Sequence, residues 1–480
     1  MNMNIYDLLP ALPEIVLLTM ICLVLVTDLF IKDDEKDITF WLSILTLAFT
    51  LWSIFSTYPE TREVIFDGSY VSDSLSHLLK LFAVLIVAVV FFYSRDYLRH
   101  NNLMRGEYYL LGMFGLFGMM VMMSAYSMLT MYLGLETLSL SLYVLVAIDR
   151  DSTKSAEAAM KFFVLGAIAS GILLFGISWV YGVTSTLQFN EISFAIQQNP
   201  GINGVPLWFG LVFIIVGLAF KFGAVPFHMW LPDVYQGARS SVTLYIASAP
   251  KLAALALILR VLSDSFGDLH EIWQTMILII AVLSLVIGNI VAIAQNNIKR
   301  MLGYSAIAHV GFILAAIFTG TQHGYSAALF YTITYVIMAL GAFGMLLLLS
   351  REGLDIEVIS DFKGLNERNP WFALVMLFFM FGMIGVPPWV GFFAKLAVIN
   401  SVLEIGYFSI AVLMVLMSVV GAFYYLRIIW YMYFEKAIDK SLLQVSLDMK
   451  VLLSFNGMAV LVLGIFPSWL LQICRNIIFV

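Results

Sequence analysis

Long apolar stretches separated by short polar intervals run through the whole chain. About 20 consecutive apolar residues cross the hydrocarbon core of a bilayer. By that measure the sequence contains about fourteen candidate spans, and the pattern predicts an all-α integral membrane protein. The spans cover roughly residues 11–31, 38–57, 74–94, 107–123, 125–148, 158–182, 204–225, 240–263, 271–294, 300–319, 324–349, 371–398, 406–430 and 450–472. So many spans leave no room for a separate soluble domain.

The longest polar intervals are residues 58–73, 183–203, 351–370 and 434–449. The first of them carries residues that favour strands on either side of Asp67-Gly68. An Asp-Gly pair between such residues is typical of a tight turn, so this interval predicts a short β-hairpin.

Glycine and proline interrupt two of the spans, the seventh and the twelfth. Their sequences are Lys221-Phe-Gly-Ala-Val-Pro226-Phe-His228 and Gly382-Met-Ile-Gly385-Val-Pro387-Pro388. Proline removes a backbone donor and clashes with the preceding turn. In a membrane, such a break survives only against protein or a wet cavity. Paired interrupted helices point to the transport site of transporters built from repeats, although ordinary proline kinks would leave the same trace.

The two breaks lie five spans apart, which predicts two five-helix repeats, spans four to eight and nine to thirteen. Because five is odd, the second repeat is inverted relative to the first. The expected segments are residues 1–106 with three N-terminal spans, 107–263 with the first repeat, 264–434 with the second repeat and 435–480 with a C-terminal span.

Composition agrees with a membrane protein and excludes other classes. The chain is 62% hydrophobic and 12% charged, with a mean hydropathy of +0.96, whereas soluble domains are about half apolar and a quarter charged. No basic cluster marks a nucleic-acid surface. Cys22 and Cys474 provide neither a metal framework nor a disulfide pattern, so no metal site is expected.

Basic residues in the loops predict the orientation, because cytoplasmic loops carry an excess of Lys and Arg. When the loops are numbered alternately, one side has sixteen basic residues and the other has only Arg62 and Arg475. The sixteen are Lys32, Lys36, Arg95, Arg99, Arg105, Arg150, Lys154, Arg239, Lys299, Arg300, Arg351, Lys363, Arg368, Lys436, Lys440 and Lys450. This bias fits an even number of spans with both termini on the outer, periplasmic side.

Four charged residues stand deep inside apolar spans: Glu136, Lys221, Lys251 and Lys395. A charge at membrane depth costs about 2.5–3.5 kcal/mol on insertion scales, so it persists where it is paired, wetted or used. A row of titratable groups along a dry interior is what a proton path requires. Static ion pairs are the structural alternative.

Other polar residues in the spans are candidates for supporting roles. Lys221 or Lys161 would serve as the partner that keeps Glu136 ionised, and spacing does not choose between them. His228 and His309 would be relay points between spans. The basic residues nearest the helix ends are expected to reach the membrane surface with their long stems. They are Lys80, Arg260 and Arg427.

Three segments resemble the antiporter-like subunits of respiratory complex I, the proton-translocating NADH:quinone oxidoreductase. They are Gly134-Leu-Glu136-Thr-Leu-Ser-Leu, the run from Lys221 to Ala238, and the run from Asn297 to Gly311. The resemblance covers roughly residues 70–430. Within the family it favours the N-type members, because Lys395 stands where M-type members are expected to have Glu and because no long lateral helix of the L type follows the fourteenth span.

The resemblance implies a role for each matching residue. Glu136 would be the glutamate that switches the pump and Lys221 its broken-helix partner. Lys251 would be the central lysine, and Lys395 the lysine on the exit side. Lys161 looks like the lysine near the proton entry, and Lys299 and His309 like parts of the region that links two half-channels.

The implied function is outward proton movement in the bacterial inner membrane, driven by quinone reduction in other subunits. The chain would be a non-redox subunit of a translocase that itself holds no cofactor, with NADH, FMN, iron–sulfur clusters and quinone on partner subunits. K-type and M-type membrane subunits are the expected neighbours. A subunit of an Mrp-type cation/proton antiporter is the main alternative, and a membrane scaffold with inert ion pairs is another.

Overall fold

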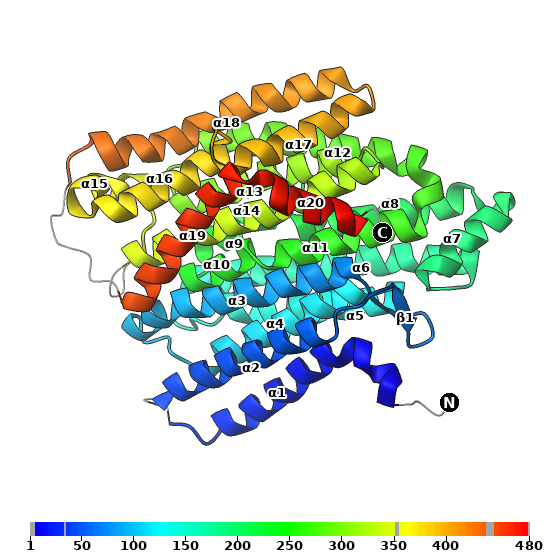
Figure 1. Ribbon diagram of the computed structural model, residues 1–480, viewed down its shortest axis with the longest axis horizontal. Helices are drawn as coiled ribbons and strands as arrows, with labels where there is room; N and C mark the ends of the chain where they lie inside the picture. The colour runs from blue at the N-terminus through cyan, green and yellow to red at the C-terminus, as the bar shows by residue number, and fades with distance from the viewer. Residues whose placement is uncertain (1–4, 33–34, 351–354, 438–445, 479–480) are drawn as a thin grey trace. The chain divides into compact units, whose positions relative to one another are not determined.

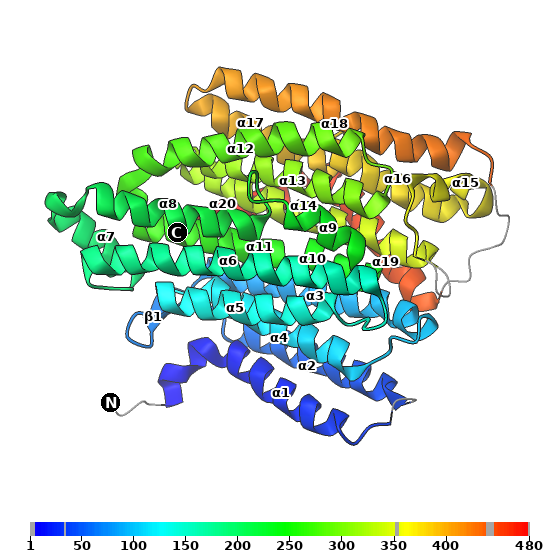
Figure 2. The ribbon, with the colours of Figure 1, turned by 180° about the vertical axis from the view of Figure 1, so that it is seen from behind.

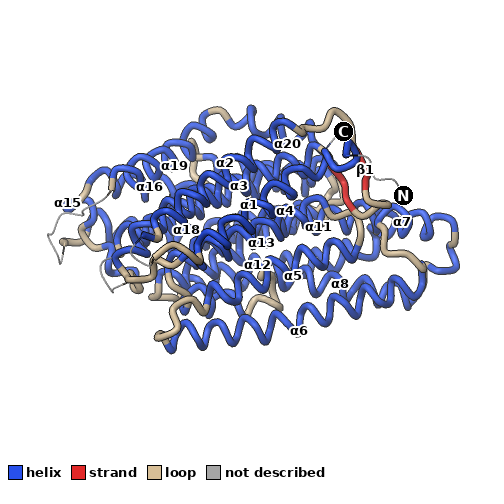
Figure 3. The backbone as a smooth tube through the Cα atoms, turned by 90° about the horizontal axis from the view of Figure 1, so that it is seen from below, coloured by secondary structure: helices blue, strands red, loops and turns tan. Residues whose placement is uncertain are grey.

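The computed structural model describes residues 5–32, 35–350, 355–437 and 446–478. Arg351 and Lys440, which the sequence predicts on the inner side, lie outside the described residues. Most of the described chain is helical (Figure 3). Thirteen of its helices are long and apolar enough to cross a membrane, which confirms the predicted fold class.

The backbone divides into two compact units. The first comprises Met1–Phe91, Asn102–Lys221 and Ala249–Trp273, and the second comprises Phe92–Asn101, Phe222–Ser248 and Gln274–Val480. Helices α3 and α8 begin in the first unit and end in the second, and α12 begins in the first unit shortly before its boundary.

The helices of the first unit are α1 (Leu12–Asp28), α2 (Asp37–Ser56), α3 (Ser74–His100), α4 (Gly106–Ser124), α5 (Met128–Val146), α6 (Thr153–Thr184), α7 (Phe189–Gln198), α8 (Val205–Phe222) and α11 (Pro250–Leu259). A π-helical stretch, Arg260–Ser265, continues α11. Strands β1 (Glu63–Ile65) and β2 (Tyr70–Ser72) pair antiparallel, with Val64 opposite Val71. The predicted hairpin around Asp67-Gly68 is therefore confirmed.

The helices of the second unit are α9 (Trp230–Gly237), α10 (Ser240–Ala247), α12 (His270–Ile293), α13 (Ile298–Ile317), α14 (Gln322–Leu349), α15 (Leu365–Arg368), α16 (Pro370–Ile384), α17 (Val390–Glu404), α18 (Phe408–Phe434), α19 (Leu447–Ile465) and α20 (Pro467–Ile478). Helix α14 lies at the core of this unit, with contacts to α13, α16, α17, α19 and α20 (Figures 1 and 2). Of the residues in its most apolar 18-residue stretch, 94% are buried, as expected for a helix that is hydrophobic on all sides.

Both predicted breaks are present. Helix α8 ends at Phe222 and the next helix begins at Trp230, while α16 ends at Ile384 and α17 begins at Val390. Each gap contains a glycine with a positive φ angle, Gly223 or Gly385. That conformation is open to glycine at little cost and ends a helix.

Two predicted spans differ from the structure. The eighth, residues 240–263, does form a candidate span, Ser240–Ser265, but it is interrupted, because α10 ends at Ala247 and Pro250 opens α11. Proline fits the first turn of a helix, where its missing N–H costs nothing. The fourteenth, residues 450–472, ends at Ile465, and Pro467 opens the separate helix α20. In both places a proline that the apolar pattern passed over begins a new helix.

Candidate functional site

Close packing of two helices positions Glu136 in the first unit. A Cβ atom added at Gly134 would lie 2.9 Å from the Gly118 carbonyl oxygen on α4. Glycine therefore lets the α4 and α5 backbones meet. Two residues further along α5, the Glu136 carboxylate accepts a hydrogen bond from Ser170 on α6. The carboxylate thus has a defined partner on a neighbouring helix.

Lys221 reaches the same stretch of α5 from the last turn of α8. Its Nζ donates to the Ser139 hydroxyl over 2.7 Å, and Ser139 follows Glu136 by one helical turn. Lys161 pairs with Glu157 on its own helix over 2.9 Å, and its side chain is 44% exposed. Through Ser139, Lys221 contacts α5 one helical turn from Glu136.

Lys251 stands at the beginning of α11, directly after Pro250. Only 3% of it is exposed, and the residues that follow it along α11 are all buried. Helix α11 packs against α4. The structure thus confirms that this lysine is deeply buried, as its place in the eighth span predicted.

Lys395 lies in the second unit beside the second helix break. Its Nζ donates to the Ile384 carbonyl over 2.8 Å, and Ile384 is the last residue of α16. A helix C-terminus carries partial negative charge and attracts a cation. The ammonium also lies 5.2 Å from the centre of the Phe312 ring on α13. Helix α13 therefore runs past this lysine.

His309 occupies the preceding turn of α13, where tyrosines surround it. Its Nδ1 is 2.8 Å from the Tyr331 hydroxyl and its Nε2 is 3.1 Å from the Tyr425 hydroxyl. The Tyr331 ring stacks on Phe312, with 5.6 Å between centres. Because Phe312 also touches Lys395, the structure gathers Lys395 and His309 around one face of α13.

His228 and Lys299 lie elsewhere in the second unit. His228 is 8% exposed, and its ring centre is 6.4 Å from that of Tyr304. Lys299 is in the first turn of α13, where its Nζ contacts Asp355 at 3.3 Å and donates to the Ala238 carbonyl over 2.9 Å. About three helical turns separate Lys299 from His309. Their assignment to a linking region remains a prediction.

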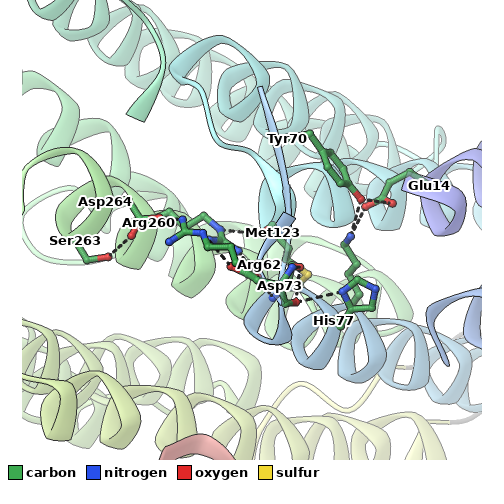
Figure 4. Close-up of polar contacts among 11 residues, drawn as sticks. Glu14, Arg62, Tyr70, Asp73, His77, Met123, Arg260, Ser263 and Asp264 are labelled. Atoms are coloured by element: carbon green, nitrogen blue, oxygen red, sulfur yellow. Dashed lines mark hydrogen bonds and ion pairs between the residues drawn. The ribbon is translucent and has the colours of Figure 1, made fainter. Parts of the chain in front are cut away.

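A group of buried ion pairs in the first unit was missed by the sequence reasoning (Figure 4). Lys80 is 0% exposed, and its Nζ lies 2.7 Å from Glu14 and 3.0 Å from the Tyr70 hydroxyl. Arg260 is 3% exposed and donates to Asp73 over 2.7 Å. The expectation that these two cations reach the membrane surface is therefore wrong, because each is neutralised internally.

One local signal for this group exists in the sequence. Asp73 precedes α3 and accepts a hydrogen bond from the Ser76 amide, which is the pattern of an N-cap residue. Burial alone raises the pKa of Asp73, but the charge of Arg260 outweighs it and holds that pKa well below the ordinary value. Glu14 and Lys80 are 66 positions apart in the sequence, so no local spacing predicts that they pair.

Arg427 donates to the Ile293 carbonyl over 3.4 Å and to the Gln295 carbonyl, next to the end of α12. It thus lies near a helix end, as its position predicted. Among the described residues, no three His, Cys, Asp or Glu side chains are grouped so that they could hold a metal ion.

Comparisons with known proteins give the chain its family. Residues 125–421 match the family model described as NADH:quinone oxidoreductase/Mrp antiporter, TM. The chain is 56% identical to the NADH-quinone oxidoreductase subunit N of Thioalkalivibrio sulfidiphilus, over the whole of both chains. It is 29% identical to a chain of respiratory complex I from Thermus thermophilus, with a TM-score of 0.82 and coverage of 96% of this chain and 98% of that one.

A chain of the Mrp complex from a Dietzia species has a TM-score of 0.86 at 19% identity, over 99% of this chain and 97% of that one. That likeness concerns the fold alone. The chain belongs to the NADH:quinone oxidoreductase/Mrp antiporter family, and within it to the subunit N relatives of respiratory complex I.

Proposed function

We infer that this chain is a non-redox, membrane-arm subunit of a proton-translocating NADH:quinone oxidoreductase in the bacterial inner membrane. Quinone reduction in other subunits would drive it. The observation that carries the proposal is the Glu136–Ser139–Lys221 group, in which a carboxylate and an ammonium share one face of α5 beside a helix break. Opposite charges interact strongly where little water screens them.

The physical basis is electrostatic coupling in a poorly screened interior. Coulomb interactions over several ångströms at low dielectric are worth several kcal/mol. Protonation of Glu136, or a shift of its carboxylate away from Lys221, therefore changes how firmly Lys221 holds its proton. A displaced proton would pass to Lys251 and then to Lys395, which would release it on the outer side. Lys161, Lys299, His228 and His309 would be supporting relay points.

Lys395 suits the role of a group that loads and unloads a proton. Its ammonium is held by the Ile384 carbonyl and the face of Phe312, and neither of these carries a full charge. The hydroxyls of Tyr331 and Tyr425 on either side of His309 can accept and donate in turn.

Residues 107–263 and 264–434 would be the two inverted repeats, each with a broken helix.

The remaining parts of the proposal concern the surroundings of the chain. NADH, FMN, iron–sulfur clusters and quinone would bind to partner subunits, with K-type and M-type membrane subunits as neighbours. Both termini would face the periplasm. The likeness to an Mrp complex chain does not favour cation exchange, because at 19% identity it reports the fold, whereas the relative that is 56% identical is a subunit N.

The test is NADH-driven proton pumping in inside-out membrane vesicles. Glu136→Gln and Lys221→Ala should each slow proton transfer by about 10²-fold or more, the smaller end of what a positioned proton-transfer group contributes. A fluorescent dye that responds to the pH gradient reports pumping, and native gels report assembly. Glu60→Gln, a change at an exposed loop carboxylate, is the matched control. Near-normal pumping by both variants in assembled complexes would refute the proposal.

A further inference from the structure

A polar cavity opens in the second unit. Its volume is about 370 Å³, and its walls come from the ends of α3 and α14 and the start of α19. Polar side chains lining it include Asp96, Tyr97, His100, Ser350 and Ser446. A space of this size has room for several water molecules and polar partners for them.

Tyr97 connects this cavity to a buried carboxylate. It lines the cavity, yet only 4% of it is exposed. Its hydroxyl donates to Asp355 over 2.5 Å. The Asp355 side chain is itself 8% exposed. Tyr97 therefore stands between solvent in the cavity and a carboxylate that has little direct access to it.

Asp355 gathers donors from three helices. In addition to Tyr97 on α3, it accepts a hydrogen bond from the Ser240 hydroxyl at the start of α10 over 3.0 Å. Lys299 on α13 lies 3.3 Å from the same carboxylate oxygen, Oδ2. Burial of so many polar groups is costly unless they are paired. Their pairing produces an unbroken hydrogen-bonded row from the cavity wall through Tyr97 and Asp355 to Lys299.

We propose that the cavity is a proton-entry vestibule on the cytoplasmic face. Tyr97, Asp355 and Lys299 form the relay that leads from it into the interior of the helix bundle. This inference rests on the proposed function, because the orientation proposed there places the C-terminal ends of α3 and α14 and the start of α19 on the inner side. The basic residues Arg95 and Arg99, on the last two turns of α3, belong to that side.

Each transfer moves one proton and leaves the groups as they were. After Lys299 passes its proton onward, the Asp355 carboxylate takes the Tyr97 hydroxyl proton while a water in the cavity gives one to the tyrosine oxygen. Asp355 then passes its new proton to the neutral Lys299 amine and is a carboxylate again. The water regains its proton from the inner solution. No oxidant or other reactant is needed.

The electrostatics of Asp355 support this order of events. Burial tends to raise the pKa of Asp355, while the charge of Lys299 and the hydrogen bonds from Tyr97 and Ser240 bring it below the ordinary value. When Lys299 becomes neutral, its lowering influence disappears while burial remains. The carboxylate therefore binds a proton more firmly at the moment when the lysine needs one.

The experiment compares Asp355→Asn and Tyr97→Phe with a matched control in assembled complexes. Asp355→Asn keeps the size of the side chain but removes its charge, and Tyr97→Phe keeps the buried ring but removes the hydroxyl. NADH-driven proton uptake by both variants should fall to the level of Lys221→Ala. Asp361→Asn, at an exposed carboxylate in the short 3₁₀ helix Ile359–Phe362, should pump normally, and Asp355→Glu should restore part of the uptake.

A second measurement tests the cavity itself. Ser446→Cys, in a background with Cys22 and Cys474 replaced by serine, should react with a membrane-impermeant maleimide in inside-out vesicles and not in right-side-out vesicles. Normal pumping by Asp355→Asn and Tyr97→Phe, with Lys221→Ala deficient, would overturn the relay and leave the proposed function standing. Normal pumping by all three variants would refute both the relay and the proposed function. If Asp355→Asn fails to assemble, Tyr97→Phe decides, and labelling from the outer face alone would refute the vestibule.

Discussion

At the scale of single residues, the buried charges fall into two kinds. Lys80 and Arg260 have carboxylate partners within 2.7 Å, whereas Lys221 and Lys395 are held by a hydroxyl and a carbonyl. A carboxylate beside a buried cation offsets much of the cost of burying that charge. A hydroxyl or a carbonyl carries no full charge and offsets less of it. Lys80 and Arg260 are therefore assigned structural roles, and Lys221 and Lys395 remain candidate proton carriers.

The Lys80–Glu14 pair is expected to be structural. Removal of one partner of a buried ion pair costs about 3–5 kcal/mol, because the other charge is left alone. Lys80→Ala should therefore lower the amount and thermal stability of the assembled complex, measured by native gels after heating. Replacing both partners, as Glu14→Gln with Lys80→Met, should recover most of the loss. Pumping per assembled complex should suffer less from Lys80→Ala than from Lys251→Ala, and the opposite order would contradict this division of roles.

At the scale of elements, glycine determines how near the helices come and where they end. In the second break, Gly385 has a φ angle of +84°, and a Cβ atom there would lie 2.9 Å from the Lys395 side chain. Gly385, which follows the last residue of α16, therefore also makes room for the aliphatic part of the Lys395 side chain. Between α4 and α5, Gly118 and Gly134 allow direct backbone contact. Small residues have this role at helix interfaces in membranes.

Gly134→Val tests whether this contact positions Glu136. The added side chain would meet the Gly118 carbonyl and force α4 and α5 apart, at a cost of typically about 1–3 kcal/mol for overpacking. We expect assembled complexes with clearly reduced NADH-driven pumping, because the carboxylate moves relative to Ser170 and Lys221. Gly182→Ala on α6 is the control, since a Cβ atom there meets nothing within 4 Å. Equal pumping by the two variants would show that the contact does not position Glu136.

At the scale of the whole molecule, orientation determines which face supplies protons. The loop charges predict that both termini are periplasmic and that the loop before α6, with Arg150 and Lys154, is cytoplasmic. An alkaline phosphatase fusion, which is active only outside the cytoplasm, should be active at residue 478 and inactive at residue 152. The reverse result would invert the proposed direction of transport and place the cavity beside Tyr97 on the outer face.

The sequence by itself determined the class of protein, the approximate spans, the hairpin and both broken helices. These follow from local physics, because about 20 apolar residues, an Asp-Gly turn, or glycine followed by proline act over a few neighbouring positions. Depth in a span likewise identified Glu136, Lys221, Lys251 and Lys395 as unusual. Local information was also enough to place His309 well inside a helix.

Only the tertiary structure decided which charges meet. It paired Glu14 with Lys80 and Asp73 with Arg260, placed Lys221 one helical turn from Glu136 through Ser139, and brought Asp355 to Tyr97 and Lys299. Such contacts join positions tens to hundreds of residues apart. The energy of an ion pair or hydrogen bond depends on distance in space and on the surrounding dielectric. Neither the distance in space nor the local dielectric can be deduced from the order of residues along the chain.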